Sequence, residues 1–255
     1  MTQLVIPMAG LGSRFKEAGY SLSKPLLPMG KFRMFEVVIS NLWHESITKV
    51  ILVSRRGAIT QADRVSMGRE LARPVFNVEL DSLSEGPAAS VELTSPLLNP
   101  EEPLVVANSD QYLDASLAPF YSSLTTGTTH QILTMDASDA RWSFVELDEQ
   151  NFVCRVREKE VISNIATVGV YGFASAAHFL DGYRRMRLAN DRTNGEFYVA
   201  PIFNHLKKRS TRIVHLGPLG RVMHGLGVPA DYESFLSNGP LERACSIAEA
   251  TLGRK

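Results

Sequence analysis

The chain has 255 residues, a length that suits one large α/β domain or two small ones. Its 27 basic and 27 acidic residues cancel, which argues against nucleic acid as the main partner. Two distant cysteines, no secretory signal and no apolar run of about eighteen residues indicate a cytoplasmic protein without disulfides or membrane insertion.

The first apolar run, residues 4–8, is short, bulky and uncharged, as a buried parallel strand is. Two glycines follow it, which allow a tight turn and a close approach of the backbone to a ligand. Backbone N–H groups in such a loop can point at a phosphate, and Arg14 adds a fork of donors. Residues 14–33 hold five basic residues, Lys24 among them, and one acidic residue. This local positive patch predicts a phosphate-rich small molecule as partner; a solvated basic loop is the alternative.

The next segments alternate between strand and helix patterns. Apolar spacing predicts helices over 34–44 and 59–71, and buried strands over 49–54 and 74–80. This alternation predicts a parallel sheet covered on both faces, with ligands at the carboxyl ends of its strands. Gly86 before Pro87 is a helix-start signal.

Asp110 follows a further buried strand over 104–107 and should emerge at its carboxyl end. A carboxylate there, beside phosphates, suits Mg²⁺, which takes one or two carboxylates plus substrate oxygens. A turn or cap role is the plainer alternative. Asn108 and Asp114 are lesser candidates.

In the second half of the chain the predicted pattern changes from strands joined by helices to an antiparallel meander. Residues 143–147 and 152–157 predict antiparallel strands, and 128–135 predicts a strand with one exposed face. A long strand over 163–173 follows. The remaining expected elements are helices over 116–124 and 175–188, a strand over 211–216, a helix capped by Asp231 and ending at Ser237, and a last helix over 241–252 that packs on the body or on a partner chain.

The glycine-rich segment fits neither common phosphate loop, because Phe15 stands where the dinucleotide fingerprint needs a third glycine and no Walker Gly-Lys-Ser/Thr occurs. It resembles the Gly-x-Gly-Ser/Thr-Arg and Pro-Lys-Pro-Leu signature of the nucleotidyltransferases that make nucleoside-diphosphate sugars. The matching residues are Gly10, Gly12, Ser13, Arg14, Lys24, Pro25 and Leu26, with Ser23 in place of the first proline.

A second match lies far downstream and in the correct order. Glu158-Lys159, then Ala166, Gly169, Tyr171 and Phe173, fit the family's Glu-Lys and Ala/Thr-x-Gly-x-Tyr-x-Phe segments. Glu196 stands in a Gly-Glu segment before a helix, where capping of that helix is the alternative role.

The resemblance implies an α/β fold, a Rossmann-like mostly parallel mixed sheet with helices on both faces (nucleotidyltransferase or GT-A-like), with the meander in its acceptor-binding half. It implies one domain over 1–255, with a nucleotide-binding half over about 1–125 and an acceptor-binding half over 126–255. The implied reaction joins an NTP to a sugar 1-phosphate, giving an NDP-sugar and pyrophosphate with Mg²⁺. The implied roles are catalysis for Arg14, Lys24 and Asp110, the last also holding the metal; nucleotide binding for Ala9, Gly10, Leu11, Gly12, Ser13, Gly86, Ala88 and Asn108; and acceptor binding for Glu158, Lys159, Gly169 and Glu196.

One departure from the family matters. Gly225, beside His224, stands where the family often has a second metal-binding Asp. Either the second ligand comes from elsewhere, or one carboxylate and the substrate phosphates suffice. A catalytically inactive nucleotide-binding module, a cytidylyltransferase for a non-sugar phosphate such as phosphocholine, and an NAD-dependent oxidoreductase are the alternatives. The sequence leaves the base, the sugar, the pathway (cell-surface polysaccharide precursors are the family's common product) and association into a homo-oligomer open.

Overall fold

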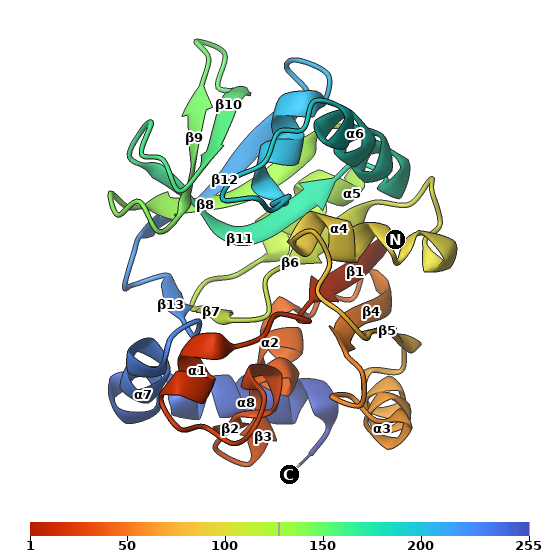
Figure 1. Ribbon diagram of the computed structural model, residues 1–255, viewed down its shortest axis with the longest axis vertical. Coiled ribbons are helices and arrows are strands. Elements are labelled where there is room, and N and C mark those ends of the chain that lie inside the picture. Colours follow the sequence, from red (N-terminus) through yellow and green to blue (C-terminus); the bar gives the residue numbers. More distant parts are fainter. Residues whose placement is uncertain (127, 255) are drawn as a thin grey trace.

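The computed structural model describes residues 1–126 and 128–254, and its main feature is one large sheet (Figure 1). Within these residues the sheet has nine strands: β1 (Thr2–Pro7), β4 (Ile47–Arg55), β5 (Val75–Leu80), β6 (Leu104–Ala107), β8 (His130–Asp136), β9 (Ser143–Leu147), β10 (Val153–Glu158), β11 (Ile165–Phe173) and β12 (Thr211–Pro218). The spatial order is β10-β9-β11-β6-β1-β4-β5, with β8 also on β11 and β12 on β8. The expected α/β architecture is therefore confirmed.

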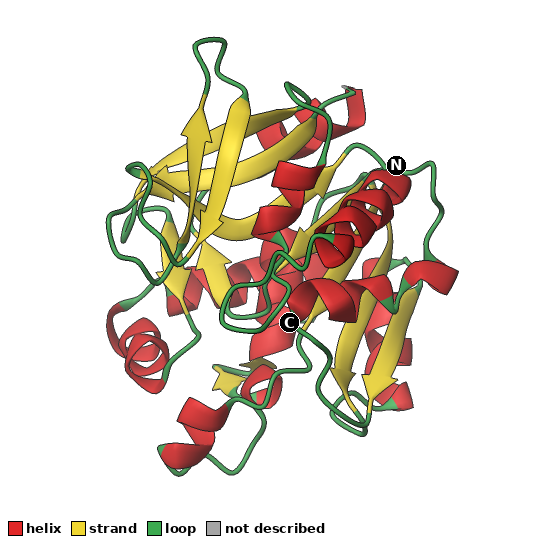
Figure 2. Ribbon diagram, turned by 45° about the horizontal axis from the view of Figure 1, so that its top comes forward, coloured by secondary structure: helices red, strands yellow, loops and turns green. Residues whose placement is uncertain are grey.

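Helices cover both faces of this sheet (Figure 2). They are α1 (Ser13–Glu17), α2 (Met34–Leu42), α3 (Gln61–Leu71), α4 (Pro87–Glu92), α5 (Ala118–Thr126), α6 (Ala176–Leu188), α7 (Pro229–Asn238) and α8 (Leu241–Leu252), with 3-10 turns η1 (Lys24–Leu26), η2 (Ser95–Leu97) and η3 (Ala200–His205). Two short two-stranded sheets are separate: β2 (Pro28–Met29) with β3 (Phe32–Arg33), and β7 (Gln111–Leu113) with β13 (Met223–Gly225). None of the described helices combines the length and apolarity that a membrane crossing requires.

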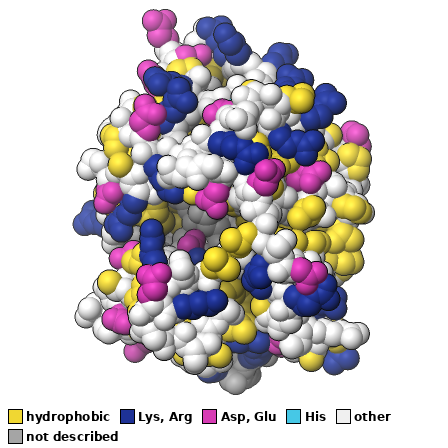
Figure 3. All heavy atoms as spheres, viewed as in Figure 1, with side chains coloured by type: hydrophobic (Ala, Val, Ile, Leu, Met, Phe, Trp, Pro, Cys, Tyr) yellow, Lys and Arg dark blue, Asp and Glu magenta, His cyan; other side chains and the backbone are white. Residues whose placement is uncertain are grey.

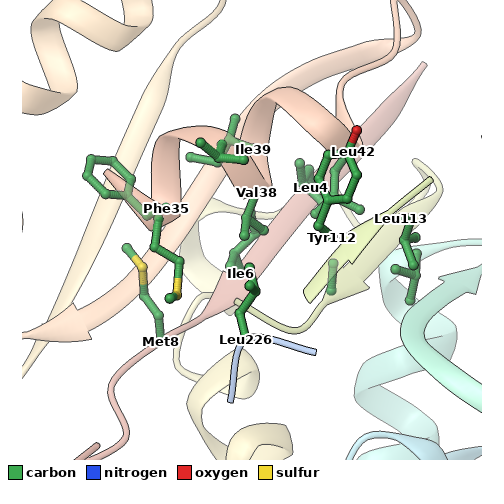
Figure 4. Packing of buried hydrophobic residues seen from close by; sticks show 14 of the residues in the cluster. Leu4, Ile6, Met8, Phe35, Val38, Ile39, Leu42, Tyr112, Leu113 and Leu226 are labelled. Atoms are coloured by element: carbon green, nitrogen blue, oxygen red, sulfur yellow. The ribbon is translucent and has the colours of Figure 1, made fainter. Parts of the chain in front are cut away.

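The side chains of β1 alternate between two separate hydrophobic cores, one on each face of the sheet. Leu4 and Ile6 belong to the cluster under α2, whose Val38 and Ile39 lie over them (Figure 4). Val5, between them in sequence, belongs to the cluster on the other face. Because strand side chains point alternately to opposite faces, an uninterrupted apolar strand has to be covered twice.

Strands β5, β4, β1 and β6 are parallel neighbours, and the chain order reverses between β1 and β6. In sheets of this kind the loops leaving two such strands diverge to opposite faces and open a crevice at their carboxyl ends. The glycine loop after β1 and the Asn108–Asp110 turn after β6 both lie at this point.

The rest of the sheet is mixed: β11 runs antiparallel to β6, β8 and β9. The expectation of an exposed face for the strand over 128–135 is wrong. β8 is flanked by β11 and β12, and residues 130–135 are all buried. A central strand is covered on both faces, whatever its sequence alternation suggests.

The C-terminal helices fold back onto the N-terminal half, where α8 packs against α2 and α3. The last helix therefore lies on the body of its own chain. The expected cap role of Asp231 is wrong, because Val228 occupies the N-cap position of α7, Asp231 lies within the first turn, and no described side chain caps the helix. A proline at the first helical position replaces a side-chain cap as the start signal there.

A buried ion cluster fixes the end of the chain. Glu36 is 2% exposed and is bound by Arg33 (3.1 Å) and Arg254 (2.8 Å), and Arg254 also holds Glu70 at 2.7 Å. Burial by itself would raise the pKa of Glu36, but hydrogen bonds from Arg33 and Arg254 outweigh it and lower the pKa.

We predict that Arg254→Met lowers the free energy of unfolding at pH 7 by about 2 kcal/mol, since Glu36 keeps only one cation. A carboxylate with a lowered folded-state pKa stabilises above its unfolded pKa and loses this effect as the pH falls through the folded pKa. The difference from wild type should therefore shrink in urea titrations below about pH 4.5. Lys31→Met, which removes the half-exposed Lys31–Glu249 pair at 2.9 Å, is the control and should cost under about 1 kcal/mol. An equal loss in both variants at every pH would contradict this account.

Candidate active site

A cleft of about 410 Å³ opens at the carboxyl ends of β1 and β6. Figure 3, drawn in the same view as Figure 1, shows a hollow near the centre of this face, with acidic and basic side chains around it. Eleven of the fifteen residues to which the sequence analysis gave a site role line this cleft: Ala9, Gly10, Arg14, Lys24, Gly86, Asn108, Asp110, Glu158, Lys159, Gly169 and Glu196. Leu11, Gly12, Ser13 and Ala88 do not line it, and Asp114 is bound to Arg243 instead.

The glycine loop is held from beneath by Phe15, the residue that breaks the dinucleotide pattern. Phe15 is 1% exposed, and its ring meets Tyr20 and Tyr232 edge-on. Gly12 begins α1 with a φ of 60°, a left-handed conformation that glycine adopts without strain. The side chain of Arg14, in the first turn of α1, has no hydrogen-bond or ion-pair partner in the described part of the chain, so its guanidinium is available to a ligand.

Lys24 and Asp110 meet across the cleft. The Lys24 Nζ lies 2.8 Å from Oδ2 of Asp110, and the two side chains are 21% and 31% exposed. Lys24 follows the glycine loop and Asp110 follows β6, so this pair joins the loops on either side of the strand-order reversal. Gly227 lies against the same carboxylate: a Cβ there would come within 2.9 Å of Oδ2.

Gly169 allows β11 to approach the end of β6. Its carbonyl accepts a hydrogen bond from the Asn108 N–H at 2.9 Å, and its φ is 76°. A Cβ at this position would lie 2.3 Å from Nδ2 of Asn108 and 2.5 Å from Oε1 of Gln111. Gly169 thus orders the loop that carries Asp110 as well as lining the cleft.

The Gly86 segment forms another wall. Ser84 Oγ and Ser90 Oγ are 2.7 Å apart, and Gly86 packs against the backbone of Phe197. Ala88 is fully buried and donates its N–H to the Phe197 carbonyl at 3.0 Å. Ala88 therefore supports this wall from behind.

The cleft lining also carries two carboxyl groups and an ammonium group, those of Glu158, Glu196 and Lys159. Burial raises the pKa of Glu158, against a hydrogen bond from Ser143 that lowers it. Lys159 has a left-handed φ of 57° and donates from Nζ to the Tyr198 hydroxyl at 2.7 Å. That hydroxyl donates in turn to Oε2 of Glu196 at 2.7 Å.

Several cleft residues escaped the sequence analysis. Tyr198 could have been predicted as a cleft residue. It lies two positions after Glu196, and residues two positions apart in an extended chain point to the same side. Arg141 and Trp142 lie in the turn before β9, and Ser143 is the first residue of that strand. No local sequence pattern marks these three residues as cleft residues, because only the fold brings them to the cleft.

The space around Gly225 is taken by other side chains. A Cβ there would lie 3.3 Å from Oδ2 of Asp231 and 3.8 Å from the Trp142 ring. Arg141 approaches the same Asp231 carboxylate at 3.6 Å. His224 packs with Tyr112 and Phe235 and does not line the cleft.

The described residues contain no group of three or more His, Cys, Asp or Glu side chains placed to hold a metal ion. Mg²⁺ differs from Zn²⁺ in needing only one or two carboxylates plus phosphate oxygens and water. The partly exposed Asp110 carboxylate on the cleft wall fits that requirement.

Comparisons with known proteins agree with this geometry. The family model described as nucleotidyl transferase matches residues 4–196. A nucleoside-diphosphate-sugar pyrophosphorylase from Vibrio cholerae RC9 is 25% identical, with a TM-score of 0.76 over 91% of this chain and 99% of that one. No curated protein sequence matches the chain.

Two more distant structures share the fold. A putative glucose-1-phosphate thymidylyltransferase from Bacillus anthracis is 20% identical, with a TM-score of 0.75 over 97% of this chain and 95% of that one. An inositol-1-phosphate CTP transferase from T. maritima is 14% identical, with a TM-score of 0.72 over 98% and 96%. Since the family model spans most of the chain and includes the glycine loop, Lys24, Asp110 and Glu196, this protein belongs to the nucleotidyl transferase family and is a nucleotidyltransferase.

Proposed function

We propose that the protein transfers a nucleotidyl group from an NTP to a sugar 1-phosphate, giving an NDP-sugar and pyrophosphate. The observation that carries this proposal is one cleft lined both by Arg14 and Lys24 and by Lys159 with the carboxyl groups of Glu158 and Glu196. We assign the Arg14 and Lys24 part of the cleft to the nucleotide and the Lys159 part to the acceptor. Such an arrangement suits two phosphate-bearing substrates that have to meet. An NDP-sugar of this kind serves as a glycosyl donor, as in cell-surface polysaccharide synthesis.

The chemistry requires no general base. A phosphate monoester has a second pKa of about 6 and is largely dianionic at neutral pH, so it is already a nucleophile. One of its oxygens attacks the α-phosphorus of the NTP, and the bond from that phosphorus to the bridging oxygen breaks as pyrophosphate leaves. The obstacle is the repulsion between two anions, and the protein has to position and neutralise them.

The nucleotide end supplies the cations for this step. Arg14, free of partners among the described residues, would bind the triphosphate together with the Gly10–Arg14 backbone. Lys24 would leave Asp110 and bind phosphate oxygens instead. There it would stabilise the negative charge that develops on the α-phosphate and on the departing pyrophosphate. Asp110, freed of Lys24, would hold Mg²⁺, and this ion when bound supplies further neutralisation of phosphate charge.

The acceptor end is built for a polyhydroxylated phosphate. Lys159 would bind the acceptor phosphate, and Glu158 and Glu196 would accept hydrogen bonds from hydroxyl groups. A choline group instead needs an open aromatic face. The two partly exposed rings here are already covered by cations: Lys159 Nζ lies 4.6 Å from the Tyr198 ring centroid, and the Arg141 guanidinium lies 4.9 Å from that of Trp142. The cleft therefore favours a sugar phosphate over phosphocholine.

A cyclitol phosphate with CTP is the second candidate. The likeness to the T. maritima inositol-1-phosphate CTP transferase and the hydroxyl-binding carboxyl groups both suit it.

The direct test measures pyrophosphate release by the purified protein across a matrix of nucleotides and phosphorylated acceptors. We expect one NTP with one hexose 1-phosphate to exceed phosphocholine by at least about 100-fold in kcat/KM, because a buried carboxyl group left without its hydroxyl partner is costly. Highest turnover with inositol 1-phosphate and CTP would select the second candidate. Nucleotide binding without pyrophosphate release from any pair would refute the proposed reaction.

We predict that Lys24→Met lowers kcat by about 10²- to 10³-fold, since it removes one preorganised cation from the transition state. Lys31→Met removes a lysine outside the cleft and should leave the rate within about twofold of wild type. Circular dichroism spectra and melting curves show whether the fold survives. A folded Lys24→Met protein with wild-type turnover would exclude Lys24 from the chemistry.

Asp110→Asn should lower kcat by a similar factor of about 10² or more, and should raise the Mg²⁺ concentration needed for half-maximal rate. Wild-type activity should disappear with EDTA and return with added Mg²⁺. Magnesium titrations of both proteins check this prediction. An unchanged magnesium requirement in the variant would show that the metal binds elsewhere.

A further inference from the structure

We propose that Tyr198 is a positioning residue that keeps Lys159 and Glu196 apart and ready for the acceptor. The inference rests on the proposed function, in which Lys159 binds the acceptor phosphate and Glu196 binds its hydroxyls. Tyr198 itself was not part of any motif in the sequence, and it lines the cleft between these two groups.

The contacts form a short relay. Lys159 Nζ donates to the Tyr198 hydroxyl at 2.7 Å, and that hydroxyl donates to Glu196 Oε2 at 2.7 Å. The phenol oxygen thus accepts from the ammonium group and gives its proton to the carboxylate, so one side chain satisfies both charged groups. Hydrogen bonds in which the donor or the acceptor is ionised are stronger than neutral ones.

Among the residues that the structure describes, neither charged side chain has another hydrogen-bond or ion-pair partner. In the part of the chain that the structure describes, Lys159 has no carboxylate within 4.0 Å, and Glu196 has no basic group within that distance. The lysine stem is long and flexible. Without the hydroxyl between them, the ammonium group and the carboxylate would be free to form a direct ion pair, which would withdraw both from the acceptor.

The backbone holds Tyr198 in place for this task. Phe197 and Val199, on either side, are 0% and 3% exposed and belong to the core under α4 and α6. The Phe197 N–H donates to the Glu85 carbonyl at 2.7 Å, and Arg192 stacks its guanidinium 3.9 Å from the Phe197 ring centroid. Burial of alternate residues turns Glu196 and Tyr198 to the same side, toward the cleft.

Tyr198→Phe tests this role because it keeps the ring and removes only the hydroxyl. Using the acceptor with the highest turnover, we expect KM for the acceptor to rise about tenfold, while kcat and KM for the NTP stay within about twofold. Tyr20→Phe is the matched control: its hydroxyl donates to Glu233 at 2.7 Å outside the cleft, and no kinetic constant should change.

A double-mutant cycle separates positioning from direct contact with the substrate. In a Lys159→Met background, Tyr198→Phe should change KM for the acceptor by less than about twofold, because no ammonium group is left for Glu196 to pair with. A tenfold rise that persists undiminished in that background would overturn the proposal.

A second readout does not depend on turnover. A direct Lys159–Glu196 pair favours the ammonium form, so acetylation of Lys159 by acetic anhydride, followed by peptide mass spectrometry, should slow about threefold or more in Tyr198→Phe, with Lys24 unchanged. Should the wild-type protein turn over no substrate pair, the proposed function fails while this labelling still decides the role of Tyr198. Unchanged labelling of Lys159 would overturn the inference.

Discussion

The ion pair between Lys24 and Asp110 is the interaction on which the site depends, because it joins the two loops that the sheet order brings together. β1 and β6 are neighbours although about a hundred residues separate them, and the chain reverses its strand order between them. Asp110 lies just past the carboxyl end of β6, and Lys24 begins η1, which follows the glycine loop and α1 after β1. The neutral protein thus holds a pair of opposite charges in its cleft, and the same cleft is lined by Arg14, whose side chain has no partner among the residues that the structure describes.

The second half of the fold completes the cleft from the other side. β11 lies antiparallel to β6, and Gly169 lets it approach closely enough to order Asn108. The same half delivers Glu158 and Lys159 at the end of β10 and Glu196 before η3. Cations from both halves of the fold thus line one cavity, and this arrangement suits the proposed reaction between two phosphate-bearing substrates. The packing of Phe15 and Phe197 behind the cleft fixes the walls from which these charges project.

The local patterns of the sequence predicted most elements and one wall of the site. The apolar runs over β1, β4 and β6 are strands, and helices pack on both of their faces. The motif residues Lys24, Asp110 and Glu158 do line one cleft. The predictions that failed concern residues whose environment is set by neighbouring strands, and a local sequence pattern contains no information about those strands. β8 alternates like a half-exposed strand but is central, and β7 and β13 are too short to show a period. Arg141 and Trp142 reach the cleft only because β9 pairs beside β11.

A crystal structure with a non-hydrolysable NTP and Mg²⁺ tests the central claim most directly. The account predicts that the triphosphate lies between the Gly10–Arg14 loop and Lys24, that Lys24 Nζ has left Asp110 for a phosphate oxygen, and that the metal ion binds the freed carboxylate. A triphosphate bound outside this cleft, with the 2.8 Å Lys24–Asp110 pair intact, would contradict it.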